Sequence, residues 1–143
     1  IGKRGISSFK KEGDEKTPKG TYKFTHFFYR KDRISPIKTS LKKIVIKKNM
    51  GWCDDTNSPN YNKMIKFPYS YNAEKLYIKK KIYDIILVLN YNKNPVKKNK
   101  GSAIFLHLAT KNYYPTQGCI ATSKKDLKLI LKNINKKSTI KIY

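Results

Sequence analysis

A five-residue apolar run, Ile85-Ile86-Leu87-Val88-Leu89, constrains the fold more than any other stretch of this chain. Its length fits a β-strand, and the absence of polar residues predicts a strand buried on both faces. A second apolar run, Ala103-Ile104-Phe105-Leu106, ends at His107 and predicts another buried strand. The polar segment 90–100 brings the chain back between them, so we expect the two strands to be antiparallel neighbours.

Shorter patterns predict further strands around this pair. Thr21–Tyr29 alternates as a half-buried strand does, with His26 in a structural role. Residues 41–47 contain the β-branched run Ile44-Val45-Ile46, and residues 138–143 alternate again at the end of the chain. Residues 74–83 fit either a helical turn or an edge strand.

One helix is clear from its cap and its apolar stripe. Ser123 is in the N-cap position and Asp126 can reach back to it, as in a capping box. The stripe that should be buried is Leu127, Ile130, Leu131 and Ile134. About six strands and one packed helix predict a mainly β fold, either a sandwich or a barrel-like sheet.

The length of 143 residues predicts one domain, residues 1–143. No apolar stretch approaches 18 residues, so we expect no transmembrane segment. No signal peptide is visible, but the chain starts at Ile1 without a methionine. We therefore expect part of the natural N-terminus to be missing, and the sequence says little about compartment.

The formal net charge of +24 suggests a polyanionic partner, and nucleic acid is the first class to consider. Only three of the 33 basic residues are arginine, namely Arg4, Arg30 and Arg33. Proteins that read bases or grip phosphates rely on arginine, so we expect no specific nucleic-acid binding. A positive surface would still attract a polymer rich in carboxylates.

Two cysteines do not form a disulfide framework, and no Cys/His cluster suggests a metal site. Cys119 follows Gly118 and precedes the helix pattern, an arrangement that favours a thiolate. A histidine brought beside it, such as His107, can exchange a proton with the thiol. The alternative is that both are ordinary buried residues. Cys53 lacks such a turn and is the poorer candidate nucleophile.

Several motifs resemble the YkuD-type L,D-transpeptidases, cysteine enzymes that cross-link or trim peptidoglycan stem peptides. Gly118-Cys119-Ile120 after a strand ending in histidine resembles their catalytic signature. The likeness extends from about Gly5 to the C-terminus and is closest to a compact, single-domain proteobacterial branch. The other matching segments are Glu12-Gly13-Asp14, Thr17–Tyr22, Met50–Asp55, Tyr61-Asn62, Leu89–Asn92 and Gly101–His107.

The resemblance implies a YkuD-like β-rich fold and a thioester acyl-enzyme on Cys119, with His107 as acid and base. Backbone N–H groups around Gly118 and Cys119 would stabilise the oxyanion. Thr116, or a backbone carbonyl of residues 116–118, would orient the imidazole. It implies no metal or cofactor, stem peptides as partners, and a periplasmic or cell-envelope location. We expect a monomer.

The motif Thr116-Gln117-Gly118-Cys119 departs from the commoner Ser/Thr-His-Gly-Cys, which leaves the donor bond and the acceptor open. The donor bond is diaminopimelate–D-Ala or L-Ala–D-Glu. One alternative is an L,D-carboxypeptidase or endopeptidase that trims stem peptides. An alternative of another class is a basic module that binds nucleic acid or anionic glycan.

Candidate substrate-binding residues come from polar and aromatic positions in loops. Gln117 can contribute a donor, Arg33 can pair with a carboxylate, and Asp54 and Asp55 suit an ammonium group. For Arg33 the competing interpretation is a solvated turn, and for the two aspartates an Asx-turn. Asn90 and Tyr91 should lie near the mouth of the site. The matching motifs add Trp52, Tyr61 and Asn62. Residues 50–67, which hold several of these, read as a long, turn-rich loop.

Overall fold

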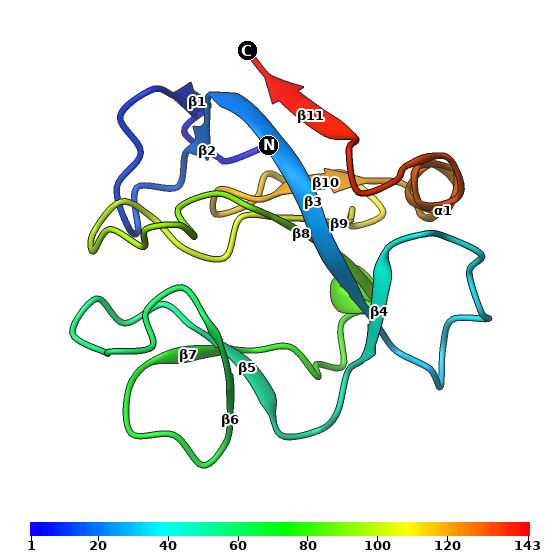
Figure 1. The fold of residues 1–143 in the computed structure, drawn as a ribbon, viewed down its shortest axis with the longest axis horizontal. Coiled ribbons are helices and arrows are strands. Elements are labelled where there is room, and N and C mark those ends of the chain that lie inside the picture. The colour runs from blue at the N-terminus through cyan, green and yellow to red at the C-terminus, as the bar shows by residue number, and fades with distance from the viewer.

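The computed structural model describes residues 1–143 and contains eleven strands, one 3₁₀ turn and one α-helix. The mainly β fold is confirmed, although more strands form than the six expected, because several have only two to four residues. A six-stranded sheet is the centre of the molecule. Its order is β10-β9-β8-β3-β11, with β4 also paired to β3 (Figure 1). No helix is long and apolar enough to cross a membrane.

The five-residue apolar run forms β8 (Ile85–Leu89), and all five of its residues are buried. It pairs antiparallel with β9 (Phe105–Leu108), as expected, and with β3 (Gly20–Tyr29) on its other side. His107 lies inside β9 rather than at its end. The parallel strand β10 (Ile120–Thr122) completes this side of the sheet.

The long strand β3 carries the other side of the sheet. Its first residues pair antiparallel with β11 (Thr139–Ile142), and its last residues pair parallel with β4 (Lys42–Val45). The pairing of β3 with β8 shifts register between Phe24 and His26, where β3 passes from pairing with β11 to pairing with β4.

Both faces of the central sheet are covered, which explains the absence of polar residues in β8. Ile85, Leu87 and Leu89 belong to one apolar cluster, whereas Ile86 and Val88 point to the other. The first cluster includes Leu127 and Leu131 of α1 (Lys124–Asn133). Ser123 caps α1 by accepting a hydrogen bond from the Asp126 N–H, as the sequence predicted.

The second cluster lies between the central sheet and a small three-stranded sheet of order β6-β5-β7, which is at the bottom of Figure 1. Its strands are β5 (Met50–Cys53), β6 (Met64–Lys66) and β7 (Ala73–Lys75). The prediction of an irregular loop over residues 50–67 was therefore wrong at both of its ends. Gly51 permits this packing, because a Cβ there would lie 2.6 Å from the Phe67 ring and 2.9 Å from Ile65.

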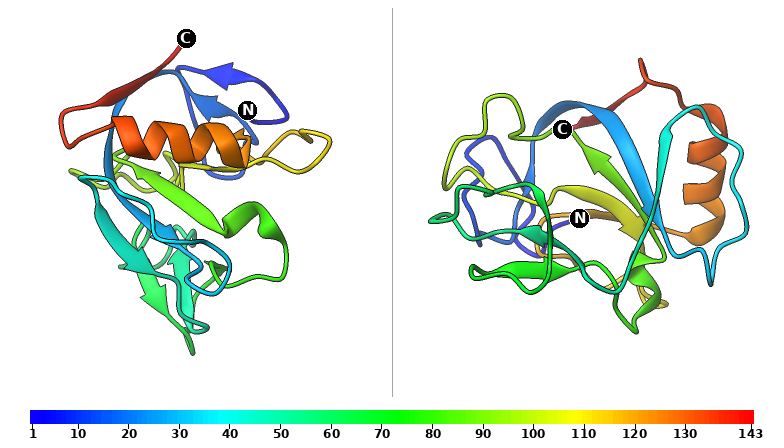
Figure 2. Two further views of the ribbon diagram at one scale, coloured as in Figure 1. Left: turned by 90° about the vertical axis from the view of Figure 1, so that its right-hand side faces the viewer. Right: turned by 60° about the horizontal axis from the view of Figure 1, so that its bottom comes forward.

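Residues 74–83 contain both of the alternatives that the sequence left open. They continue β7 and end in the 3₁₀ turn η1 (Lys81–Tyr83). At the N-terminus, β1 (Ile6–Ser7) and β2 (Thr17–Pro18) form a parallel pair. Figure 2 shows α1 beside the loop that leads into β4, where the Ser40 hydroxyl donates to the Ile134 carbonyl at 3.2 Å.

Candidate active site

Cys119 lies in a tight turn that ends directly at β10. The sequence did not predict β10, which lies between this cysteine and α1, whose N-cap is Ser123 as predicted. Thr116 closes the turn: its hydroxyl donates to the Cys119 carbonyl at 2.6 Å and accepts from the Gly118 N–H at 3.1 Å. Gly118 has a φ of 135°, and a Cβ there would lie 2.9 Å from the Lys16 carbonyl oxygen.

The Cys119 thiol is held by the backbone of the neighbouring strand. Its Sγ–H donates to the Ala103 carbonyl at 3.0 Å, and Sγ accepts from the Phe105 N–H at 3.4 Å. Burial raises the thiol pKa to about 12, and the Glu74 carboxylate adds to that shift. The resting side chain is therefore a neutral thiol, and not the helix-stabilised thiolate expected from the sequence.

His107 lies on the strand next to the Cys119 turn. In the parallel β9–β10 pair, His107 is paired with Ala121. Cys119 lies two residues before Ala121, so the side chains of Cys119 and His107 are on the same side of the sheet. The His107 Nδ1–H donates to the Leu108 carbonyl at 2.9 Å, and not to Thr116. Nε2 is then the nitrogen that can take a proton. Burial lowers the imidazole pKa, which keeps the ring neutral.

Tyr83 supports the imidazole from the end of η1. Its ring meets His107 edge to face with centroids 5.4 Å apart, and its hydroxyl donates to Glu74. Burial raises the pKa of both Tyr83 and Glu74. Neither residue was identified from the sequence, because no local pattern marks a single tyrosine in a short turn.

Cys119 and His107 line one cavity of about 780 Å³. The same cavity is lined by Thr116 and Gln117, by Ser102, which the sequence reasoning did not identify, and by charged groups of both signs. Its acidic residues are Glu12, Asp54 and Glu74, and its basic residues are Lys75, Lys79 and Lys80. A second, wholly polar pocket shares Glu12, Asp54 and Gln117 with it.

Asp55 lies in that second pocket and forms the Asx-turn that the sequence offered as its alternative role. Its two carboxylate oxygens accept from the N–H groups of Asn57 at 2.9 Å and Asn72 at 3.2 Å. Asp54, in contrast, makes no side-chain hydrogen bond through Oδ1, which is buried.

Trp52, Tyr61 and Asn62 are buried outside both pockets. The Asn62 side-chain oxygen accepts from Trp52 Nε1 at 3.0 Å and from the Ala103 N–H at 3.1 Å. Tyr61 donates to Glu12. Asn62, held by Trp52, therefore fixes the backbone at Ala103, whose carbonyl accepts the thiol hydrogen bond, and Tyr61 contacts the site through the cavity residue Glu12.

Three further candidates also lie outside the cavity. Arg33 forms an ion pair of 2.9 Å with buried Asp84, so its guanidinium is engaged within the protein. The Asn90 side chain accepts from the Lys23 N–H at 2.8 Å. Tyr91 packs against Tyr22, with ring centroids 5.5 Å apart.

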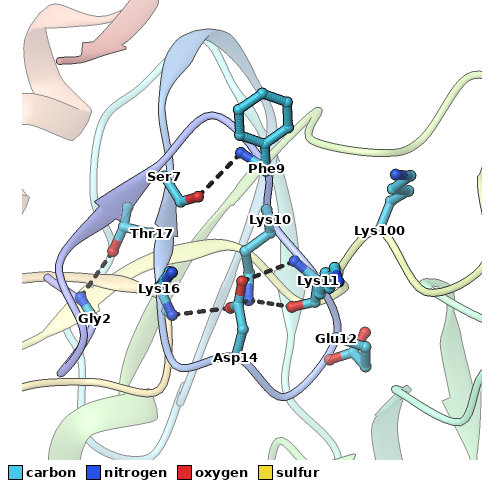
Figure 3. A network of polar contacts seen from close by, with 12 residues as sticks. Gly2, Ser7, Phe9, Lys10, Lys11, Glu12, Asp14, Lys16, Thr17 and Lys100 are labelled. Atoms are coloured by element: carbon cyan, nitrogen blue, oxygen red, sulfur yellow. Dashed lines mark hydrogen bonds and ion pairs between the residues drawn. The ribbon is translucent and has the colours of Figure 1, made fainter.

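The N-terminal segment, residues 1–20, packs against the turn that holds Cys119. Gly2 bridges to Thr116, and the Lys3 N–H donates to the Thr116 carbonyl at 2.8 Å. The buried Lys10 ammonium pairs with Asp14 and donates to the Lys11 carbonyl at 2.9 Å (Figure 3). A Cβ at Gly118 would lie 3.5 Å from the Lys10 Nζ, so this cation lies directly beneath the turn.

No group of three His, Cys, Asp or Glu side chains lies close enough together to hold a metal ion. In a comparison with protein families, the model of the YkuD family, described as the L,D-transpeptidase catalytic domain, matches residues 1–142. Searches of curated proteins and of solved structures gave no match.

Proposed function

The chain belongs to the YkuD family of L,D-transpeptidase catalytic domains, and from that premise we propose that it is a peptidoglycan L,D-transpeptidase. Residues 1–143 act as one catalytic domain in the cell envelope, with Cys119 as nucleophile and His107 as acid and base. The observation that carries this proposal is that a histidine on β9 and a cysteine in the turn that leads into the adjacent β10 line one cavity large enough for a peptide.

The first half-reaction begins with a neutral thiol and a neutral imidazole. Nε2 of His107 takes the thiol proton as the Cys119 sulfur attacks the carbonyl carbon of an L,D bond in the stem peptide. The tetrahedral intermediate collapses, the amine leaves with the proton that His107 returns, and a thioester remains on Cys119. Proton transfer thus accompanies attack, as the raised thiol pKa requires.

The oxyanion of that intermediate needs donors near the sulfur. The Gly118 N–H is already bonded to Thr116, which leaves the Cys119 N–H as the backbone donor in this turn. The side-chain amide of Gln117 lines the same cavity and is the second donor that we assign. In the second half-reaction an acceptor amine attacks the thioester and forms the cross-link.

The test is mass spectrometry of the protein incubated with muropeptide tetrapeptides. We expect dimers and an acyl adduct on Cys119 from the wild type, and neither from Cys119→Ala. Cys53→Ala is the matched control, because Cys53 is a buried thiol outside the cavity. Fragmentation of the dimers identifies the donor bond.

Two other outcomes would contradict this proposal, and each would support a different function. Trimmed monomers without dimers would mean that water takes the acyl group, which makes the protein an L,D-carboxypeptidase or endopeptidase. No product and no adduct would remove the enzymatic proposal and leave a basic binding module, whose affinity for polyanions should fall steeply with salt.

A further inference from the structure

Two buried side-chain atoms in the whole chain lack a hydrogen-bond partner, Asp54 Oδ1 and Ser102 Oγ. Both residues line the cavity that holds Cys119. Ser102 is only 7 % exposed, so water from outside does not solvate it freely. Buried polar atoms in proteins are nearly always paired. Two such atoms at one cavity therefore indicate that a polar group of a ligand supplies their missing hydrogen bonds.

Ser102 lies close to the nucleophile. It directly precedes Ala103, whose carbonyl accepts the thiol hydrogen bond. Glu12 belongs to the same neighbourhood, because its backbone N–H donates to the Asn99 carbonyl at 3.1 Å, three residues before Ser102. A ligand group bound between the side chains of Ser102 and Glu12 is therefore near the thioester that forms on Cys119.

The carboxylates of this region form no ion pair, although the chain has 33 Lys and Arg residues. The three ion pairs of the protein use Asp14, Asp32 and Asp84, none of which lines the cavity. Five of the nine acidic residues line the two connected pockets, and none of the five forms an ion pair: Glu12, Glu15, Asp54, Asp55 and Glu74. Figure 3 shows Glu12 near Lys11 and Lys100 with no contact drawn to either.

The chemistry of these groups selects the ligand. No group of three His, Cys, Asp or Glu side chains here could hold a metal ion. A primary ammonium has three N–H donors. Ser102 Oγ, Asp54 Oδ1 and the Glu12 oxygen that Tyr61 does not bond offer three acceptors. Lys75, Lys79 and Lys80 on the same cavity suit a carboxylate beside that ammonium, as at the free end of a diamino acid.

We propose that Ser102, Asp54 and Glu12 form the acceptor subsite, which binds the primary ammonium group of the incoming stem peptide's diamino acid. This inference rests on the proposed function. Asp54 takes one proton from the bound ammonium, and the neutral amine then attacks the thioester carbon. The second proton passes through His107 to the departing Cys119 sulfur, so a thioester and an ammonium become an amide, a thiol and a protonated Asp54.

The first experiment follows how the acyl-enzyme divides between amine and water. In Asp54→Asn and Ser102→Ala, acylation of Cys119 by the donor should stay within about twofold of wild type. The ratio of dimers to hydrolysed monomers should fall about tenfold and threefold, respectively. Asp126→Asn is the matched control, because Asp126 is an exposed carboxylate whose side-chain oxygen accepts from Ser123, which asparagine can also do.

The second experiment measures binding without turnover. The Cys119→Ala protein is titrated by NMR with a tetrapeptide whose diaminopimelate side-chain amine is free, and with the same peptide acetylated on that amine. Acetylation should weaken binding about tenfold, and Asp54→Asn should make the two peptides equal.

The outcomes separate this inference from the proposed function. Equal binding of the free and acetylated peptides, or unchanged dimer ratios with acylation intact, would overturn the subsite while the transpeptidase proposal stands. If the wild type forms no adduct on Cys119 and binds neither peptide, the transpeptidase proposal fails and the subsite fails with it.

Discussion

The thiol of Cys119 donates its hydrogen bond to the carbonyl oxygen of Ala103, 3.0 Å away, and not to the imidazole of His107. A neutral donor is therefore the form that the folded protein stabilises. In the proposed mechanism the bond to Ala103 must break as the proton moves to His107. The hydrogen bond to Ala103 therefore keeps the thiol unreactive until a peptide occupies the cavity.

Alkylation of Cys119 by iodoacetamide should reveal the raised pKa. Because the folded-state pKa of about 12 lies above the ordinary thiol value of 9.0, the thiolate is scarce at neutral pH. The rate should rise about tenfold per pH unit from about pH 7 to 10 without levelling off. Peptide mapping by mass spectrometry isolates Cys119 from Cys53. A plateau near neutral pH would contradict this prediction.

Lys10→Met should weaken the cysteine turn. Lys10 is 6 % exposed and is paired with Asp14, so its loss leaves a carboxylate without its partner. We expect the free energy of unfolding to fall by about 3 kcal/mol. Alkylation of Cys119 should also slow, since the Lys10 charge lowers the thiol pKa.

Lys11→Met is the matched control for that substitution, because Lys11 is exposed and uses only its backbone in these contacts. Urea unfolding should place it within about 0.5 kcal/mol of wild type. Equal effects of the two substitutions would show that the buried pair does not stabilise the turn.

Gly118→Ala should damage both stability and catalysis. The backbone φ of 135° disfavours a side chain, and the added Cβ meets the Lys16 carbonyl at 2.9 Å. We expect a loss of about 1–3 kcal/mol and a large loss of acylation, since Cys119 must shift. Gly13→Ala isolates the backbone cost, because Gly13 has a φ of 71° and no atom within 4 Å of the new Cβ. Acylation should survive in Gly13→Ala; its loss there too would contradict the assignment.

Arg33→Gln should lower stability rather than substrate affinity. The ion pair with Asp84 lies partly inside the protein, where the aspartate side chain is only 4 % exposed. Removing one partner of such a pair costs about 3 kcal/mol. Thermal and urea unfolding measure that loss, and KM for the donor peptide should stay within about twofold. Arg4→Gln, at an exposed position, should change neither quantity. A raised KM with unchanged stability would instead show that Arg33 binds the substrate.

Acid should destabilise the protein through His26. Burial, with Lys93 and Lys42 nearby, lowers its pKa from 6.5 to about 4. The unfolded chain then binds a proton below about pH 6.5 that the folded chain does not. Stability is therefore lost as the pH falls from about 6.5 to 4, by on the order of 2 kcal/mol after allowing for partial exposure.

His26→Gln should reduce that acid sensitivity by a similar amount. Urea unfolding at about pH 7 and pH 4.5 measures the difference for each protein. His107, whose pKa burial also lowers, contributes to the residual loss. A variant with the same pH dependence as wild type would exclude His26 as a cause.

Local patterns predicted the elements whose own residues specify them. β8 was predicted because burial on both faces requires five successive apolar residues, and the cap and stripe of α1 were predicted because they lie within one helix. β5 and β6 were missed because strands of three or four residues are too short to show a period. β10 was missed because its parallel pairing with β9 is a contact between distant residues.

The sequence by itself determined the family resemblance, the mainly β class and the candidate pair His107 and Cys119, because these depend on short motifs and on local periodicity. Only the tertiary structure decided what surrounds that pair. Packing buries the thiol and raises its pKa, and it engages Arg33 with Asp84. It also joins Glu12, Asp54 and Ser102 around one cavity from three distant segments. Burial and contacts between distant segments are properties of the folded chain, so local sequence patterns cannot predict them.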